Sequence, residues 1–490
     1  MKRGIVIMTG DSFGFRFDHT YTTLPTCFYT EEAINPVANP EIVIFNRSLA
    51  QQLGLDADAL LANGASVLAG NEKLDGAVQL AQAYAGHQFG HFTMLGDGRA
   101  VLLGEHLTRN EERFDIQLKG AGRTVYSRRG DGRAALGPML REFIISEAMH
   151  ALNIPTTRSL AVTSTGELIY REQALEGAVL TRIAQSHLRV GTFQYAANFA
   201  EKEDLRALAH YAIERHNPNI MQAENRYLAL LEHVLEKQAA LIAKWQSVGF
   251  IHGVMNTDNM TISGETIDYG PCAFMDVFDP TTVYSSIDTQ GRYAYGNQPN
   301  MALWNLTRFA ESLLPILHDN LEEAIALAQP VVETFPSMFE ANYFSEMGKK
   351  LGLLSIEAQD EKLILQLLDY MQRFEADFTN TFRALSEGAK PSEPLFQSTE
   401  FKEWEQKWLA RLESQGTTIA EARDFMKTVN PAVIPRNHVV EQAINEFVEG
   451  EPALYLELLQ VVTNPYAHAD SKFSEPPTDD APPFVSYCGT

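Results

Sequence analysis

The order of apolar and polar residues in the first part of the chain is typical of β-strands, with short apolar or alternating runs separated by turn residues. Strands are predicted at 41–45, 113–119, 158–163, 167–171 and 178–183. Gly96-Asp97-Gly98 interrupts two apolar runs, which predicts a hairpin over 91–104. Helices are predicted at 46–53, at 75–88 and at 137–152, where a proline stands near the start. Residues 86–185 are therefore expected to form a strand-rich unit with one main helix.

From Lys202 onward the apolar residues recur at helical spacing. Helices are predicted at 226–248, 301–317, 320–334, 339–353, 357–386, 398–414, 418–428, 439–449 and 452–462. The tail from Asp470 contains two Pro-Pro pairs and is expected to be mobile, without a packed core. These patterns predict an α+β chain in four parts, namely an N-terminal arm with accessory helices (1–85), a strand-rich lobe (86–195), a helical lobe (196–468) and the tail (469–490).

Composition narrows the classes of partner. Among 490 residues, 63 are acidic and 39 are basic, so the formal net charge is −24. Such a chain is a poor general partner for a nucleic acid or an anionic membrane, and any phosphate site has to be a local basic island. Three cysteines without a CxxC pair suggest neither a disulfide framework nor structural zinc. With no long uncharged apolar run, the protein is expected to be cytoplasmic.

Candidate chemistry concentrates in His252-Gly-Val-Met-Asn-Thr-Asp-Asn259, which is followed by Asp268-Tyr269-Gly270. Residues 260–267 read as two short β-prone runs around a turn at 263–265, so a hairpin is expected to bring the two acidic clusters together. Carboxylate and amide oxygens suit Mg²⁺ bound to a nucleotide. Protein kinases use a similar pair, the catalytic-loop Asn and the DFG Asp. The kinase catalytic base, two residues after the His, is replaced here by Val254, and a carboxylate stands at Asp258 instead.

Several basic and glycine residues in the strand-rich lobe are candidates for phosphate binding. The Gly96-Asp-Gly98-Arg99 turn can point backbone amides at phosphate, and Lys119 ends the next predicted strand. In a kinase, a lysine in this position pairs with a glutamate of the following helix, for which Glu142 is preferred over Glu147. The densest basic stretch, 126–133, is either a solvated loop or a loop that faces phosphate. A strand-rich lobe, a helical lobe and a nucleotide site between them predict a protein-kinase-like bilobal fold.

Taken together, these segments resemble the selenoprotein O (YdiU) family. The resemblance is carried by Gly96-Asp-Gly-Arg-Ala100, Gln117-Leu-Lys-Gly-Ala-Gly122, Ser127-Arg-Arg-Gly-Asp-Gly-Arg-Ala134, His252 to Asn259 and Asp268-Tyr-Gly-Pro271. It runs from about residue 12 to the third-last residue. Members of that family have a kinase-like fold and transfer AMP, in some bacterial cases UMP, to hydroxyl-bearing side chains of proteins. A triphosphate reversed relative to a kinase would bury its γ-phosphate and present the α-phosphorus to the protein substrate.

The resemblance also implies a role for individual residues. Asp258 is implied to be the proton acceptor, and Asn259 and Asp268 the ligands of Mg²⁺ or Mn²⁺. The residues implied to bind ATP or UTP are Gly96, Gly98, Arg99, Lys119, Asp131, Gly132, Arg182, Arg189 and Asp268, with Glu142 paired to Lys119. Protein substrates and a nucleoside triphosphate are thus the expected partners. The choice between the two nucleotides and between the two metals stays open.

Two alternatives and one regulatory hypothesis accompany this interpretation. A kinase-like phosphotransferase, or a nucleotide-binding pseudokinase scaffold without catalysis, would use much of the same site. The family's C-terminal selenocysteine position is Cys488 here, and a thiol is weaker redox chemistry than a selenol. One hypothesis is that Cys488 pairs reversibly with Cys272, four residues after Asp268. The other is that Cys272 is a buried small hydrophobe and the tail thiol is free.

Overall fold

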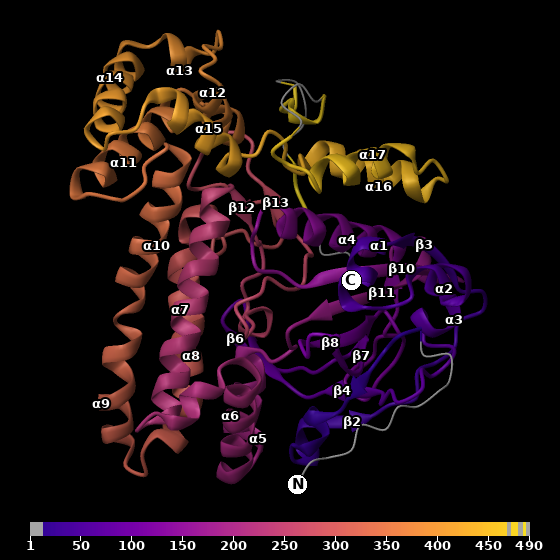
Figure 1. Cartoon of the computed structure of the whole chain (residues 1–490). Helices are drawn as coiled ribbons and strands as arrows, with labels where there is room; N and C mark the ends of the chain where they lie inside the picture. The colour runs from indigo at the N-terminus through magenta and orange to yellow at the C-terminus, as the bar shows by residue number, and fades with distance from the viewer. Residues whose placement is uncertain (1–12, 468–471, 479–483, 487–490) are drawn as a thin grey trace.

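The computed structural model describes residues 13–467, 472–478 and 484–486. A strand-rich N-terminal part and a helical C-terminal part lie side by side, so the α+β class is confirmed (Figure 1). Within the described residues, no helix has the length and apolar character that crossing a membrane requires.

The N-terminal part is built on one nine-stranded antiparallel sheet. Its main path runs β2 (Tyr29–Glu31), β4 (Leu80–Gln82), β7 (Ala100–Leu107), β8 (Arg113–Lys119), β11 (Ala174–Ala184), β10 (Arg158–Tyr170) and β3 (Glu41–Phe45). Two short strands join it from the side, with β1 (Phe17–Asp18) on β7 and β9 (Ala134–Ala135) on β11. The predicted strands at 158–163 and 167–171 are one strand, because Gly166 lies in a shift of register within the β10–β11 pair rather than in a hairpin turn.

Two predictions in this part are wrong. Residues 75–88 are not a helix but contain β4 and β5 (Ala85–Gln88). Leu80–Gln82 is buried on both faces between β2 and β7, so pairing within the sheet overrides the helix-favouring composition. The apolar runs at 91–104 do not pair with each other, since β6 (His91–Met94) pairs with β5 and β7 pairs with β8. The turn between β6 and β7 is held instead by Asp97, whose carboxylate accepts the Gln82 amide.

Helices cover the sheet and form the C-terminal part. α4 (Leu136–Ala151) packs on β10 and β11. α1 (Arg47–Leu53) and α3 (Ala65–Leu68) contact the same end of the sheet, α1 at β10 and α3 at β3, β10 and β11, and α2 (Ala57–Asn63) packs against both helices. The helical part contains α5 (Val190–Phe199), α6 (Lys202–His216), α7 (Arg226–Ser247), α8 (Gln298–Leu317), α9 (Leu321–Val332), α10 (Phe335–Lys350), α11 (Ala358–Arg373), α12 (Phe378–Glu387), α13 (Pro394–Gln397), α14 (Thr399–Ser414) and α15 (Ile419–Val429). The single helix predicted over 357–386 is therefore two helices. The chain breaks between them because Asp377 caps α12 by accepting the Asn380 amide.

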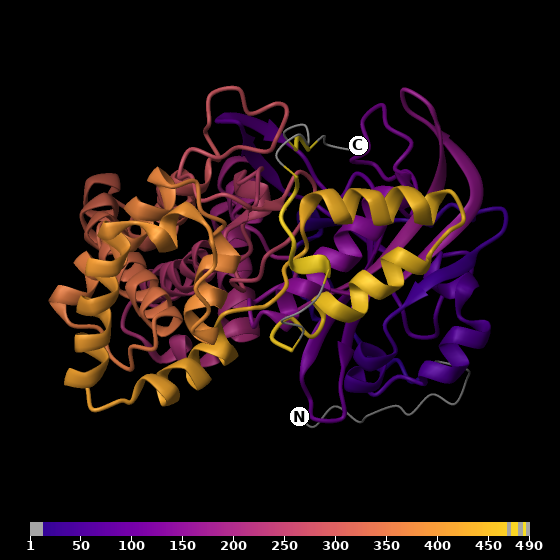
Figure 2. The same ribbon diagram turned by 90° about the horizontal axis from the view of Figure 1, so that it is seen from above.

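The last two helices return to the N-terminal part. α16 (Asn437–Val448) and α17 (Ala453–Val462) lie across α4 as a pair (Figure 2), and the Tyr455 hydroxyl donates to the Leu140 carbonyl at 2.8 Å. The prediction of an unpacked tail is wrong for the residues described there. Phe473 is buried in the main core, and Ser486 is buried with its hydroxyl donating to the Pro271 carbonyl at 2.8 Å.

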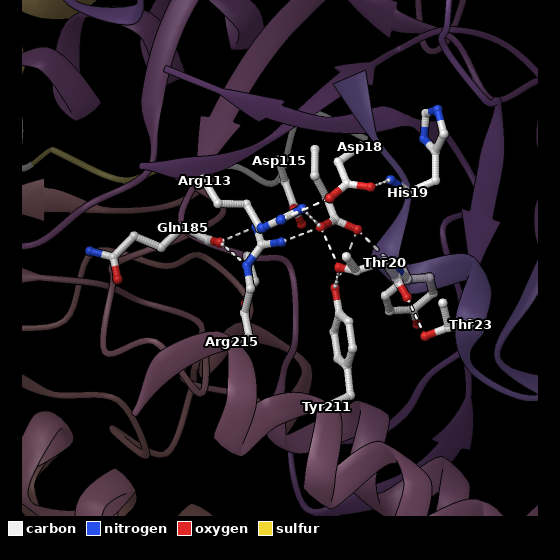
Figure 3. A network of polar contacts seen from close by, with 12 residues as sticks. Asp18, His19, Thr20, Thr23, Arg113, Asp115, Gln185, Tyr211 and Arg215 are labelled. Carbon is white, nitrogen blue, oxygen red and sulfur yellow. Dashed lines mark hydrogen bonds and ion pairs between the residues drawn. The ribbon is translucent and has the colours of Figure 1, made fainter. Parts of the chain in front are cut away.

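A buried ionic cluster joins the sheet to α6 (Figure 3). Arg215 of α6 contacts Glu105 of β7 at 2.6 Å and Asp115 of β8 at 2.7 Å, and both carboxylates are buried. Asp115 also accepts the backbone amide of His187 at 2.9 Å and lies 3.1 Å from its Nδ1. Burial lowers the pKa of His187 to about 4, so the imidazole is neutral at pH 7. The cluster thus fixes the segment that leads into Arg189.

Candidate active site

A cavity of about 470 Å³ lies where the sheet, α4 and the segment 254–271 meet. Its walls include the predicted residues Gly98, Arg99, Lys119, Glu142, Arg182, Arg189, Asp258, Asn259 and Asp268. These residues are far apart in the sequence, and the fold brings them into one pocket.

Strand register places the cationic side chains on one face of the sheet. Lys119 ends β8, and Arg182 of β11 stands directly opposite Gln117, two residues before the lysine. Because side chains alternate across a strand, Gln117 and Lys119 point the same way. Both the lysine and Arg182 reach Glu142 of α4, at 2.5 Å and 3.2 Å. Glu147, the other predicted partner, pairs instead with Arg158 at 2.6 Å.

Three cations converge on the carboxylate of Asp268. Its Oδ1 accepts from Lys119 Nζ at 2.8 Å and from Arg182 Nη1 at 2.7 Å, and its Oδ2 accepts from Arg189 Nη1 at 2.8 Å. Burial acts to raise the pKa of Asp268, but the three cations outweigh it and hold the pKa well below the usual range. With Glu142 as the second carboxylate, the cluster of three cations and two anions carries one net positive charge. Asp97 and Asp258 also line the cavity, so this positive charge belongs to the five-residue cluster alone, and its lysine and arginine donors suit phosphate oxygens.

Asp258 lies in a short 3₁₀ turn, η4 (Thr257–Asn259), beneath strand β5. Burial raises its pKa to about 6, although Arg189 acts against this shift. Its Oδ1 is buried and has no hydrogen-bond partner among the described residues. A carboxylate with an uncommitted oxygen and a pKa near neutral is suited to accept a proton.

The turn predicted at 263–265 forms, but the predicted hairpin around it does not. The Glu265 amide donates to Thr261 Oγ1 at 2.9 Å, which closes the turn. The flanking residues pair with other segments, because Thr261 bridges to Arg189 and Thr266 bridges to Thr156. This arrangement still brings the two acidic clusters together, since Arg189 donates to both the Asp258 carbonyl and the Asp268 carboxylate.

The oxygen atoms near η4 fit a hard divalent cation. The Asn259 side-chain amide donates to the Val254 carbonyl at 2.9 Å, which leaves its oxygen available. Asp268 Oδ2 accepts one hydrogen bond, and Asp258 Oδ1 accepts none among the described residues. No group of three His, Cys, Asp or Glu with metal-binding geometry occurs in the described part of the chain. Mg²⁺ needs only one or two carboxylates when phosphates and water complete its shell, so this sparse oxygen set suits it.

Part of the Gly-Asp-Gly turn lines the cavity, whereas the basic loop at 126–133 does not. Gly96 has φ +123°, and a Cβ there would lie 2.4 Å from the Tyr126 ring, so the turn packs tightly on the start of the basic loop. Gly98 and Arg99 line the cavity. Gly96, Asp131 and Gly132 are not among its lining residues, and Asp131 pairs with Arg171 at 2.8 Å on the surface.

Three residues that the sequence did not single out complete the site. Gln117 accepts from Arg182 at 2.6 Å and donates to Asp97 at 3.2 Å, which orients the arginine. The guanidinium of Arg189 lies 4.7 Å from the centre of the Tyr84 ring. Gly86 touches the Asp258 carboxylate, and a Cβ at that position would lie 2.5 Å from Oδ1. Strand alternation could have identified Gln117, whereas Tyr84 and Gly86 fall in the segment mispredicted as a helix.

Of the two cysteines in the hypothetical Cys272–Cys488 pair, only Cys272 lies among the described residues. Cys272 is fully buried, its carbonyl accepts from Arg141 at 2.6 Å, and burial raises the pKa of its thiol to about 11. A thiol in this environment is a weak nucleophile at neutral pH. Cys488 lies outside the described residues.

Sequence comparison with known proteins provides evidence on the family of this chain that does not depend on the geometry of the cavity. The family model described as "Protein adenylyltransferase SelO" matches residues 13–463. Relatives described as "Protein nucleotidyltransferase YdiU" include one from Halalkalibacterium halodurans, 59% identical over 482 residues, which are 97% of this chain and 98% of the relative. Another is from Brevibacillus brevis, 58% identical over 481 residues, or 97% of this chain and 98% of the relative. A third, from Bacillus cereus, is 59% identical over 481 residues, or 97% of this chain and 99% of the relative.

Proposed function

The chain belongs to the SelO family of protein adenylyltransferases and is a protein nucleotidyltransferase, and from this premise we propose how it acts. It transfers AMP from ATP to a Ser, Thr or Tyr hydroxyl, or to a His side chain, of a protein and releases pyrophosphate. UTP is the alternative donor and would leave UMP on the acceptor.

One observation carries this proposal. The cavity contains three buried cations that converge on Asp268, while the kinase base position holds Val254 and the only uncommitted buried carboxylate oxygen among the described residues belongs to Asp258. A kinase presents the γ-phosphate to a base two residues after the His. In this chain the base lies next to the proposed metal site instead, which supports a different phosphate as the point of attack.

We propose a kinase-like bilobal arrangement in which the nucleotide lies between a lobe at 86–195 and a lobe at 196–468, with its triphosphate reversed relative to a kinase. Lys119, Arg182 and Arg189 then hold the β- and γ-phosphates, with Glu142 keeping the lysine in place. Gly98 and Arg99 contact the nucleotide from the glycine-rich turn. Gly96, Asp131 and Gly132 complete the proposed set if the 126–133 loop closes over the bound nucleotide.

The chemical step needs positioning and charge neutralisation more than covalent help. Asp258 takes the proton of the acceptor hydroxyl, and the oxygen attacks the α-phosphorus. The bond from that phosphorus to the bridging oxygen of the β-phosphate breaks, and pyrophosphate leaves with the bonding electrons. Lys119 and Arg182 neutralise the charge that develops on the leaving group. Mg²⁺ or Mn²⁺, held by Asn259 and Asp268, would supply further neutralisation of phosphate charge when bound.

ATP labelled separately at the α- and γ-phosphate tests the proposal with acceptor proteins from a cell extract. Label from the α position alone, lost in Asp258→Asn, is the expected result. Label from the γ position alone would establish a kinase-like phosphotransferase. ATP binding without transfer of either label would favour a pseudokinase scaffold.

A further inference from the structure

We propose that the protein substrate docks on an aromatic and basic surface around the β5–β6 hairpin, and that it does so through an acidic segment carrying an aromatic side chain a few residues away from its acceptor residue. This inference rests on the proposed function and names the substrate class for it. The surface, called here the hairpin platform, consists of Phe92, Phe199, Arg292, Trp304 and Arg308.

The platform exposes aromatic rings that are already ordered. Phe92 of β6 is 40% exposed and Phe199 of α5 is 50% exposed, and their rings stack with centroids 6.2 Å apart. The ring centre of Trp304 of α8 lies 4.9 Å from the Arg292 guanidinium and 5.1 Å from the Arg308 guanidinium. Trp, Arg and Phe are the residues enriched at the centre of protein interfaces. The other three tryptophans, Trp245, Trp404 and Trp408, are buried.

The charges around the hairpin favour an acidic partner. The Arg292 guanidinium lies beside Gly90, 3.9 Å from where a Cβ would stand on that glycine. It forms no ion pair with any described carboxylate, and Asp288 nearby accepts the backbone amides of residues 292 and 293. On the other side of the hairpin, Arg128 donates to the Met94 carbonyl and likewise has no described carboxylate partner. Arg308 is paired at 2.6 Å with the half-exposed Glu311. In a chain of net charge −24, which repels acidic proteins in general, Arg292 and Arg128 are positive groups beside the hairpin without a described carboxylate partner, and they would attract an acidic segment.

The hairpin connects the platform to the catalytic carboxylate. Gly86 faces Asp258, whereas His87 stands opposite Phe92 and therefore points to the other face of the hairpin. The Phe89 amide donates to Asn256 at 3.1 Å, and the His87 amide donates to Thr257 at 2.7 Å. Phe92 of the platform and Asp258 thus lie on opposite sides of the β5–β6 hairpin. Because an extended segment advances about 3.3 Å per residue, we expect the docked aromatic side chain and the acceptor residue to be a few residues apart in the substrate.

Three synthetic peptides test the proposal. Each carries one serine a few residues away from a phenylalanine, and the flanking positions are glutamate, glutamine or lysine. With saturating ATP labelled at the α-phosphate, we expect the glutamate peptide to be modified with a kcat/KM about tenfold above the lysine peptide. Arg292→Glu should abolish this preference and Phe92→Ala should weaken it, while the KM for ATP stays unchanged. Tyr170→Ala, which truncates a 75% exposed aromatic residue on the β10–β11 hairpin, is the matched control and should change nothing.

A binding measurement is independent of catalysis. Because Trp304 is the only tryptophan that is not buried, its fluorescence should change when the glutamate peptide binds, and Trp304→Phe should remove the change. Equal modification of all three peptides, or a preference that survives in Arg292→Glu with unaltered thermal unfolding, would overturn the platform and leave the nucleotidyl transfer intact. Modification of extract proteins but of no peptide would also overturn it. Absence of α-label from peptides and extract alike would refute the proposed function, and the fluorescence result would then decide the platform alone.

Discussion

Substitution of Gly86 by alanine tests whether the position of the Asp258 carboxylate sets the rate. The added Cβ would lie 2.5 Å from Asp258 Oδ1 and 3.0 Å from its Cγ, whereas ordinary contacts begin at 3.4 Å. The carboxylate must therefore move by about 0.9 Å, and a displacement of about 1 Å at a reacting group costs roughly 100-fold in rate. We expect kcat to fall about 30- to 100-fold, which corresponds to a barrier increase of about 2 to 2.7 kcal/mol.

The added Cβ would also lie 3.0 Å from Asp258 Cβ, so the displacement reaches the base of that side chain and stability has to be followed together with the rate. The assay measures initial rates of AMP transfer at varied ATP, together with thermal unfolding. Gly270→Ala is the matched control, since Gly270 also lines the cavity and a Cβ there has no neighbour within 4 Å. Its kcat should stay within about twofold of wild type.

A double-mutant cycle refines this test. If Gly86→Ala acts through the carboxylate, it should add little to the loss already caused by Asp258→Ala, because both changes disable the same group. An unchanged kcat in Gly86→Ala, or a full additional loss on the Asp258→Ala background, would contradict the role assigned to Asp258.

Three further predictions concern titration and buried charge. Since burial raises the pKa of Asp258 to about 6 and the ionised form is the base, kcat should rise with pH through about 6, and a flat profile would refute this role. Burial also raises the pKa of Glu265 from 4.5 to about 8, so the folded state binds its proton more tightly than the unfolded state. The stabilisation from this bound proton is complete below pH 4.5 and is lost as pH rises through 8. In denaturant titrations between these pH values, the free energy of unfolding should fall by up to about 1.4 kcal/mol per pH unit, and Glu265→Gln should lack this dependence. Arg215→Met would leave Glu105 and Asp115 buried with fewer partners, and should lower the free energy of unfolding by about 3 to 5 kcal/mol in the same titrations.

The predicted elements that matched the structure have strong local signals. Alternation predicted β8, and helical spacing with an early proline predicted α4, so the elements carrying Lys119 and Glu142 could be located from the sequence. That Lys119 contacts both Glu142 and Asp268 depends on strand register and on the path of the chain after α7. Neither can be read from the periodicity of apolar residues.

The failures have a common physical cause. Residues 75–88 are rich in Ala and Gln, and their strand conformation comes from pairing with segments distant in sequence. That error concealed Tyr84 and Gly86, both of which touch the site. The packing of Ser486 on Pro271 was also unpredictable, because it depends on where a distant loop presents a carbonyl.

The most direct test of the central claim is the intact mass of an acceptor protein after incubation with unlabelled ATP and a divalent cation. The account predicts an added mass of one AMP, absent with Asp258→Asn, and pyrophosphate in the solution. An added mass of a single phosphate, with ADP as the product, would contradict attack at the α-phosphorus and the reversed nucleotide on which it depends.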